Sequence, residues 1–195
     1  MITYKNFKIQ VCENVYTPAE DTFLLADNLK VKEGDDVLEI GTGTGLVAIV
    51  AAEKANVTAT DINPHAIKCT GKNAKINNAK IRILQGDLFE PVKGEKFDVI
   101  LFNAPYLPSS DEDLTGEIID KSWDGGEDGR TIIDRFIKEV KTHLRDGGKV
   151  QLVQSSLSNI EKTMKKLKDM GFHVEITATE RFFYEDIVVI TAELP

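Results

Sequence analysis

The tetrapeptide Asn103-Ala104-Pro105-Tyr106 carries groups that could hold a planar nitrogen for reaction. The nitrogen of a primary amide or an exocyclic amine is a poor nucleophile, because its lone pair is delocalised into the neighbouring π-system. The Asn103 side-chain oxygen and the Ala104 carbonyl could each accept one N–H bond, while Tyr106 stacks on the planar group. The tetrapeptide therefore indicates chemistry at an amide or amine nitrogen, with an ordinary turn as the alternative.

A second chemical signal is the loop Gly41-Thr42-Gly43-Thr44-Gly45, which directly follows the apolar run Val37 to Ile40. Glycine lets the backbone turn tightly and approach a ligand, and the helical pattern behind the loop offers free N–H groups. A dinucleotide fingerprint, G-x-G-x-x-G, would need a glycine at position 46, where the chain has Leu46. The loop therefore predicts a nucleotide-like ligand other than a dinucleotide, with a purely structural turn as the alternative.

Two aspartates follow the next two predicted strands. Asp61 lies about 20 residues beyond Gly41, at the edge where the carboxyl ends of parallel strands meet, and its two oxygens suit a ribose diol. Asp87 could accept a hydrogen bond from an adenine amino group while Leu88 covers the ring. A simple turn aspartate is the alternative for Asp61, and Asp87 taken alone is a weak signal.

The elements that must position these residues alternate between short β-branched runs and longer helical patterns, which is typical of a wound α/β sheet. The final two strands read as an antiparallel pair at the sheet edge. We expect a single domain over residues 1–195. An N-terminal strand or hairpin arm is predicted over 7–15, and the other strands over 36–40, 56–60, 81–84, 97–102, 149–154, 173–179 and 186–192. Helices are predicted over 19–29, from the glycine loop to about 54, and over 64–77, 129–144 and 157–170.

The segment 104–128 is long for a loop inside a compact domain and is rich in Ser, Asp, Glu and Gly. Loops of this length are usually functional or disordered. It carries the only tryptophan, Trp123, which is expected either to pack over a bound group or to anchor the loop.

The composition narrows the class of protein. The chain has 195 residues and a net charge of −8, so it has no general positive electrostatic field that would bind nucleic acid. The lysines between 162 and 168 are explained by a solvent-exposed helix face. Cys12 and Cys69 lack C-x-x-C spacing and are expected as two buried thiols. The histidines are scattered, so no metal site is predicted. There is no apolar run of about 18 residues and no secretion signal, so we expect a cytoplasmic protein.

Together these residues resemble the class I S-adenosylmethionine-dependent methyltransferases, and more narrowly the HemK/PrmC-like protein-glutamine methyltransferases in their short archaeal and eukaryotic form. The resemblance covers most of the chain. Its first and last motifs are the most specific of the five. These are residues 16–25 (YTPAEDTFLL), 38–45 (LEIGTGTG), 60–64 (TDINP), 103–106 (NAPY), and 123–126 (WDGG) with 128–130 (DGR).

The resemblance implies a Rossmann-like, seven-stranded, mostly parallel sheet of order 3-2-1-4-5-7-6, with the last strand antiparallel and helices on both faces. It implies S-adenosyl-L-methionine as donor, S-adenosyl-L-homocysteine as product, and residues 1–30 as a cap over the cofactor site. The catalytic tetrapeptide is then 103–106, with Asn103 contacting the substrate amide. The implied cofactor residues are Tyr16, Pro18, Thr22, Glu39, Gly41, Thr42, Gly43, Gly45, Asp61, Ile62, Asp87, Leu88 and Asn103.

The implied reaction is methylation of the glutamine in the Gly-Gly-Gln motif of a class 1 translation release factor. Two departures from the family stand out. Ala104 replaces a proline, which removes a restraint on φ. The roughly 35 residues before the first core strand cannot form the N-terminal helical domain of bacterial members. In the short relatives a small zinc-binding activator pairs with the edge strand, here Ile81 to Leu84, although ordinary burial beneath a loop would also explain that strand.

Three alternatives remain open from the residues alone. An exocyclic amine of DNA or RNA fits the same pocket, although the negative net charge argues against a nucleic acid substrate. A lysine of another protein is a further acceptor. The chain could also be a non-catalytic scaffold that keeps the cofactor loop. The presence of Asn103 and Tyr106 argues against this alternative.

Overall fold

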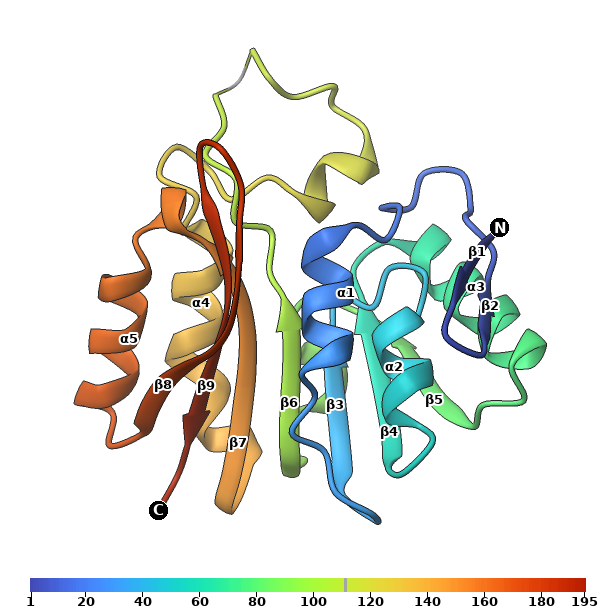
Figure 1. Cartoon of the computed structure of the whole chain (residues 1–195), viewed down its shortest axis with the longest axis horizontal. Helices are drawn as coiled ribbons and strands as arrows, with labels where there is room; N and C mark the ends of the chain where they lie inside the picture. Colours follow the sequence, from blue (N-terminus) through green and yellow to red (C-terminus); the bar gives the residue numbers. More distant parts are fainter. Residues whose placement is uncertain (111) are drawn as a thin grey trace.

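The computed structural model describes residues 1–110 and 112–195, and it consists of a seven-stranded sheet between helical layers and an N-terminal hairpin (Figure 1). The hairpin strands are β1 (Ile2–Tyr4) and β2 (Phe7–Ile9). The large sheet contains β3 (Asp36–Ile40), β4 (Asn56–Asp61), β5 (Ile81–Gln85), β6 (Phe97–Asn103), β7 (Leu144–Ser155), β8 (His173–Arg181) and β9 (Asp186–Glu193). The α-helices are α1 (Glu20–Asp27), α2 (Leu46–Ala51), α3 (Pro64–Ile76), α4 (Thr131–Val140) and α5 (Ile160–Asp169).

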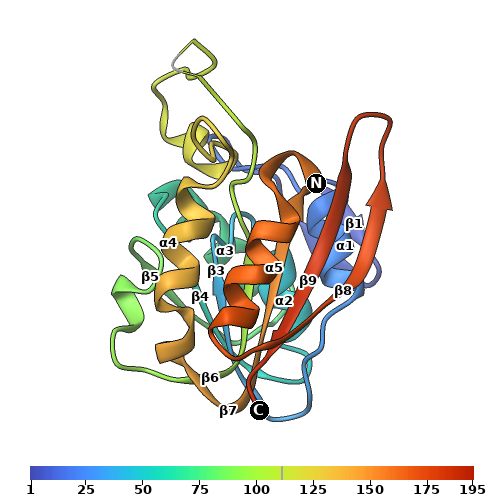
Figure 2. The same ribbon diagram turned by 90° about the vertical axis from the view of Figure 1, so that its left-hand side faces the viewer.

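The strand order confirms the predicted fold class. It runs β5-β4-β3-β6-β7-β9-β8, which is 3-2-1-4-5-7-6 when the sheet strands are numbered along the chain. All neighbours are parallel except β9, which is antiparallel to both β7 and β8. Helices α1, α2 and α3 lie against one face, and α4 and α5 against the other (Figures 1 and 2). In the described part of the chain, none of these helices is both long and apolar enough to cross a bilayer.

The central strands β3, β4 and β6 end at a common level. They are buried almost throughout, as expected of parallel strands that helices cover on both faces. Ile40 at the end of β3 is in register with Thr60 of β4 and with Phe102 of β6. The glycine loop, Asp61 and Asn103 therefore follow the three strands at one edge of the sheet, where the sequence places them.

The observed boundaries differ from the predicted ones at β7 and at the helix before it. The predicted strand 149–154 begins five residues earlier, at Leu144, which pairs with Phe97 across a register shift. Gly147, with φ of 71°, lies within this extension instead of ending it. The predicted helix 129–144 is accordingly shorter, since α4 ends at Val140 and a 3-10 turn follows.

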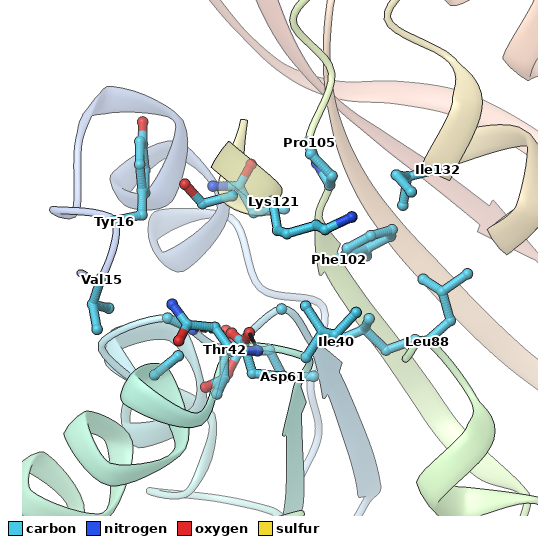
Figure 3. A pocket seen from close by; sticks show the side chains of 18 of the residues that line it. Val15, Tyr16, Ile40, Thr42, Asp61, Leu88, Phe102, Pro105, Lys121 and Ile132 are labelled. Carbon is cyan, nitrogen blue, oxygen red and sulfur yellow. Dashed lines mark hydrogen bonds between the residues drawn. The ribbon is translucent and has the colours of Figure 1, made fainter. Parts of the chain in front are cut away.

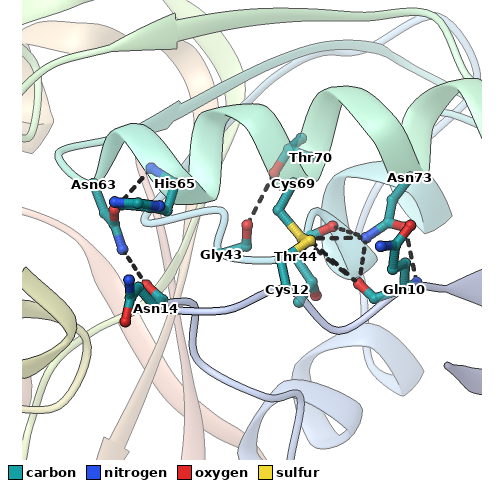
Figure 4. Close-up of a disulfide and its surroundings, with 10 residues drawn as sticks. All are labelled: Gln10, Cys12, Asn14, Gly43, Thr44, Asn63, His65, Cys69, Thr70 and Asn73. Atoms are coloured by element: carbon teal, nitrogen blue, oxygen red, sulfur yellow. Dashed lines mark hydrogen bonds between the residues drawn. A yellow bond between two sulfur atoms is a disulfide. The ribbon is translucent and has the colours of Figure 1, made fainter.

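The expectation of two free thiols is wrong, because Cys12 and Cys69 form a disulfide across 57 residues (Figure 4). Only 7–9 of the predicted arm 7–15 is strand; the chain then runs along α3. Gln10 pairs with the Asn73 side chain through N–H···O bonds of 2.8 and 3.0 Å. The Asn63 amide also donates to the Asn14 carbonyl at 2.7 Å. These contacts are between residues distant in sequence, so spacing alone did not predict them.

Opening the disulfide should lower stability measurably. A cross-link over a loop of this length reduces the conformational entropy of the unfolded chain, which raises the free energy of unfolding by about 4 kcal/mol. Cys12→Ser should therefore lower the thermal midpoint by about 10 °C. The half-buried Cys12 is the better site, because Cys69 is only 1% exposed. Differential scanning calorimetry checks this, with reduced wild-type protein as the control. Equal midpoints for oxidised wild type and variant would contradict the expected stabilisation.

Candidate active site

A cavity opens beyond the ends of β3, β4 and β6 (Figure 3). It encloses about 1110 Å³, counted to its open mouth. This volume includes solvent at the open mouth, through which a ligand can enter. Of the residues predicted for the site, those that line the cavity are Tyr16, Pro18, Thr22, Glu39, Gly41, Thr42, Gly43, Asp61, Ile62, Asp87, Leu88, Asn103 and Pro105. Gly45, Ala104 and Tyr106 lie beside it.

The glycine loop packs against α3, whose first turn also lines the cavity through Ala66. A Cβ on Gly43 would meet nothing within 4 Å. A Cβ on Gly45 would approach the Thr70 Cγ2 to 2.8 Å, and φ at Gly45 is +82°. Gly43 therefore leaves open space beside the cavity, whereas Gly45 allows the loop to pack against α3. This explains why Gly45 lies behind the lining residues.

Asp61 holds the loop in place. Its two carboxylate oxygens accept hydrogen bonds from the backbone N–H of Gly43 at 2.9 Å and of Asn63 at 2.8 Å. Asn63 in turn caps α3 by accepting from His65 N–H at 2.9 Å. Burial raises the pKa of Asp61, and these backbone N–H groups counteract the shift. The carboxylate therefore borders the cavity on a rigid support.

Glu39 is a buried acid at the end of β3. It accepts a hydrogen bond from the Thr42 hydroxyl at 2.5 Å and is 4% exposed. Burial is the main cause that raises the pKa of Glu39 from 4.5 to about 8, and the nearby charge of Asp61 adds to the rise. A protonated carboxyl is therefore present in the cavity wall over much of the neutral range.

The Glu39 pKa predicts a pH dependence of stability. Because the folded-state pKa lies above the ordinary value, Glu39 stabilises the fold fully below pH 4.5, and this contribution is lost as pH rises towards 8. The unfolding free energy of wild type minus that of Glu39→Gln should fall by up to about 1.4 kcal/mol per pH unit in this window. Urea titrations at three pH values measure the difference. A pH-independent difference would show that the Glu39 pKa is ordinary.

Asp21, which the sequence reasoning did not assign, is the centre of the polar network beside the cavity. It is 6% exposed. Its Oδ2 accepts from Asn103 Nδ2 at 3.0 Å and from the hydroxyls of Tyr106 and Tyr16, both at 3.2 Å. Its Oδ1 accepts from the backbone N–H of Thr22 at 2.6 Å. Burial raises the pKa of both tyrosines, and the Asp21 charge raises it further, so both hydroxyls keep their protons.

This network fixes the orientation of the Asn103 amide. Its nitrogen donates to Asp21, and its buried Oδ1 has no hydrogen-bond partner among residues 1–110 and 112–195. An unpaired buried carbonyl oxygen is costly and indicates a missing partner. Ala104 is buried beside it, and Tyr106 is 9% exposed with its hydroxyl on Asp21. Asn103 lines the cavity, so its amide oxygen is a polar atom without a protein partner in the cavity wall of the described structure.

The segment 104–128 folds back on itself. Leu107 and the stretch Trp123 to Gly125 pair through backbone bonds of 3.1 and 2.9 Å. Trp123 is half-buried and is not among the cavity-lining residues, which favours the loop-anchor interpretation. Ile118, Lys121 and Ser122 line the cavity instead. Asp111 of this segment lies outside the described residues.

The residues predicted for the adenine side, Asp87 and Leu88, also line the cavity. Asp87 accepts from Arg135 at 2.7 Å through Oδ2, so one of its oxygens already has a partner. Leu88 lies in the left-handed region with φ of 46°, which costs a non-glycine residue about 1–2 kcal/mol. Ile62 is apolar yet 38% exposed beside the cavity. Two apolar side chains, Ile62 and Leu88, and a buried hydrogen-bond acceptor, the Asp61 carboxylate, fit a nucleoside.

Several proteins of known family are similar to this chain in sequence and in fold. Residues 17–125 match the family model described as the methyltransferase small domain. A Methanocaldococcus jannaschii protein named as a protein N5-glutamine methyltransferase is 47% identical over 98% of this chain and 98% of its own length. Human methyltransferase HEMK2 is 35% identical over 81% of this chain and 79% of its own.

A solved structure agrees with these relatives. A chain of the E. cuniculi Mtq2-Trm112 complex, described as responsible for methylation of the eRF1 translation termination factor, is similar with a TM-score of 0.77 and 27% identity. The match covers 93% of this chain and 99% of that one. The chain therefore belongs to the methyltransferase small domain family, in the HemK/PrmC-like branch that its motifs predicted.

Proposed function

We propose that this protein transfers the methyl group of S-adenosylmethionine to the glutamine side-chain nitrogen in the Gly-Gly-Gln motif of a class 1 release factor. The buried Oδ1 of Asn103, which has no hydrogen-bond partner in the described part of the chain, carries the proposal, because it could accept from an N–H of a planar methyl acceptor. The names of the relatives support glutamine as that acceptor. Since release factors act in translation, the proposal also places the protein in the cytoplasm.

The donor would lie across the tips of β3 and β4. Asp61 is suited to the ribose diol, the free oxygen of Asp87 to the adenine amino group, and Ile62 and Leu88 to the faces of the ring. The remaining predicted donor-site residues are Tyr16, Pro18, Thr22, Glu39 and the glycine loop, so residues 1–30 would cover this site. When bound, S-adenosylmethionine supplies an electrophilic methyl group on a sulfonium.

The acceptor would lie at the tip of β6. Asn103 Oδ1 and the Ala104 carbonyl would accept the two N–H bonds of the glutamine amide and aim its nitrogen at the donor. As that nitrogen gains positive charge, the two hydrogen-bond acceptors interact with it more strongly than in the ground state. Loss of one of its N–H protons to solvent would then leave the neutral methylated amide, with S-adenosylhomocysteine as the other product. The protein thus lowers the barrier by orientation and by preorganised acceptors, while Asp21 keeps the Asn103 oxygen turned inward.

The decisive experiment follows methyl label into candidate acceptors. Purified protein with labelled donor is incubated with an intact release factor, with its Gly-Gly-Gln→Gly-Gly-Ala variant, with transfer RNA and duplex DNA, and with lysine-rich protein. Mass spectrometry should locate one methyl group on the glutamine and none on the variant. Labelling of nucleic acid or lysine instead would assign another acceptor, and donor binding without turnover on any substrate would favour a scaffold.

Asp61→Ala tests the ribose assignment. Loss of a charged hydrogen-bond acceptor costs about 1.5–3 kcal/mol, so donor affinity should fall at least tenfold. Isothermal titration calorimetry measures it, with Asp36→Ala at the opposite end of β3 as the matched control. If both variants bind the donor as wild type does, Asp61 does not hold the ribose.

The free edge of β5 is the proposed site of a small activator subunit. Among the described residues, β5 pairs with β4 on one side only, and Ile81, Ile83 and Leu84 are half-buried. An edge strand of this kind can be extended by a strand from a partner, and the similar solved chain comes from a two-protein complex. Co-expression with a candidate activator, followed by zinc analysis and activity assays, tests the partner and its predicted zinc. Replacing Ile83 by proline should abolish pairing while isolated donor binding persists.

A further inference from the structure

Three adjacent aromatic side chains stand at the tip of the β8–β9 hairpin. Phe182, Phe183 and Tyr184 are 41%, 91% and 85% exposed, and we name them the aromatic tip. The Phe183 and Tyr184 rings contact each other edge to face, with centroids 4.7 Å apart. Scattered exposed apolar residues are ordinary, but three together on a projecting hairpin form a patch, and patches of this kind mark interaction sites.

The hairpin is anchored beside the proposed acceptor site. Ser155, at the end of β7, hydrogen-bonds to the Glu185 carboxylate, and Ser156 accepts from Asp186 N–H at 3.0 Å. The Glu185 charge also contributes to the raised pKa values of Tyr16 and Tyr106, so the turn lies near that pocket. The hairpin and the described parts of the long loop, 104–110 and 112–128, project from the same end of the molecule (Figures 1 and 2).

The register gives the reach of the tip. Asn103 is level with Val153 of β7, which is level with Val189 of β9. Val189 is three residues from Asp186, where β9 begins, which at about 3.3 Å per residue is about 10 Å along the strand. The aromatic tip lies in the turn beyond Asp186, and β9 is two strands away from β6, at about 4.8 Å per strand. A seven-residue peptide centred on an acceptor glutamine extends only about 10 Å to either side. A short acceptor peptide therefore ends before the tip, whereas a folded domain reaches it.

The charges around the tip favour a protein over a nucleic acid. Within residues 180–186 the tip is flanked by three acidic residues, Glu180, Glu185 and Asp186, and by one basic residue, Arg181. The Arg181 Nε lies 3.9 Å from the Asp186 Oδ1. Aromatic rings can stack on bases, but binding of a polyanion also requires neutralising cations. Aromatic residues are enriched in protein–protein interfaces and often dominate their energetics.

We infer that the aromatic tip docks on the folded domain that carries the acceptor glutamine, at a surface remote from the glutamine itself. The inference rests on the proposed function, because a glutamine that enters the cavity brings its domain to this end of the molecule. The tip contributes to recognition of the intact protein substrate and not to the reaction. Its loss therefore affects KM for the intact substrate and leaves turnover at saturation unchanged.

The test compares Phe183→Ser/Tyr184→Ser with wild type on two substrates, an intact release factor and a seven-residue Gly-Gly-Gln peptide. KM for the intact factor should rise at least tenfold, with kcat and the kcat/KM for the peptide within twofold of wild type. Ile176→Ser is the matched control, because Ile176 is 44% exposed on β8 away from the tip. Phe183→Ser alone replaces the double variant if the latter has a lowered thermal midpoint.

The outcomes separate the two proposals. If wild type methylates the intact factor and the tip variant does so with unchanged KM, the docking inference is overturned and the proposed function stands. Equal losses on factor and peptide would mark a disturbance of the site and would also overturn the inference. If wild type transfers no methyl group to the intact factor, the proposed function fails and the inference that rests on it fails too.

Discussion

Asn103→Ala is expected to lower the turnover number about 100-fold, with the dissociation constant of S-adenosylmethionine changed by less than about threefold. The buried Oδ1 of Asn103 has no hydrogen-bond partner within the described residues. We therefore expect it to accept a hydrogen bond only when the amide of the methyl acceptor is bound. A contact that strengthens as charge develops on the acceptor nitrogen contributes to kcat. Removal of one preorganised acceptor of this kind costs about 3 kcal/mol.

Single-turnover assays at saturating donor and acceptor measure this loss, and calorimetry measures donor binding. Asn56→Ala is a suitable control, because Asn56 stands at the opposite end of β4, away from the cavity. A turnover number within threefold of wild type would remove Asn103 from the mechanism. A large loss of donor affinity would instead assign Asn103 to donor binding.

The features that the sequence predicted well are those that depend on residues adjacent in the chain. The apolar strand before Gly41, the three glycines and the start of α2 form one continuous pattern, and Asn63-Pro64 marks the start of α3 by local capping. The parallel order of the sheet followed from the family resemblance of such local motifs. The observed register then places the ends of β3, β4 and β6 at one level.

The features that were missed depend on contacts between distant residues. Asp21 and Asn103 are 82 residues apart, and an acid in the first turn of α1 has an ordinary explanation in the helix dipole. Its signal was its place between Tyr16 and Thr22, two residues already predicted to line the site. The Cys12–Cys69 bond has the same character, since only the path of the N-terminal segment along α3 brings its two sulfurs together.

Ala104 illustrates a departure that the structure accommodates. The family usually has proline there, whose ring would restrain φ. In this chain Ala104 is 3% exposed, and the Asn103 side chain before it and the Tyr106 hydroxyl after it are both held by Asp21. The hydrogen bonds from the Asn103 and Tyr106 side chains to Asp21 thus restrain the loop. They compensate in part for the restraint on φ that a proline at position 104 would supply.

Asp21→Asn is the second substitution with a large expected effect, and it should lower turnover about 100-fold as well. An amide nitrogen in place of Oδ1 would face the Thr22 N–H, donor against donor. In place of Oδ2 it would face the Asn103 nitrogen, and the Asn103 amide would then turn so that its oxygen accepts from residue 21. That turn points the Asn103 nitrogen into the cavity, where it repels the acceptor N–H.

A double-mutant cycle separates this positioning role from an independent one. If Asp21 acts through Asn103, the variant Asp21→Asn/Asn103→Ala should lose about as much turnover as either single variant, because the second change removes nothing further. Independent roles would multiply to about 10,000-fold. Asp27→Asn, the same substitution on the same helix but exposed and bonded to Tyr4, controls for the chemical change itself. Multiplicative losses, or an equal loss in Asp27→Asn, would show that Asp21 does not orient Asn103.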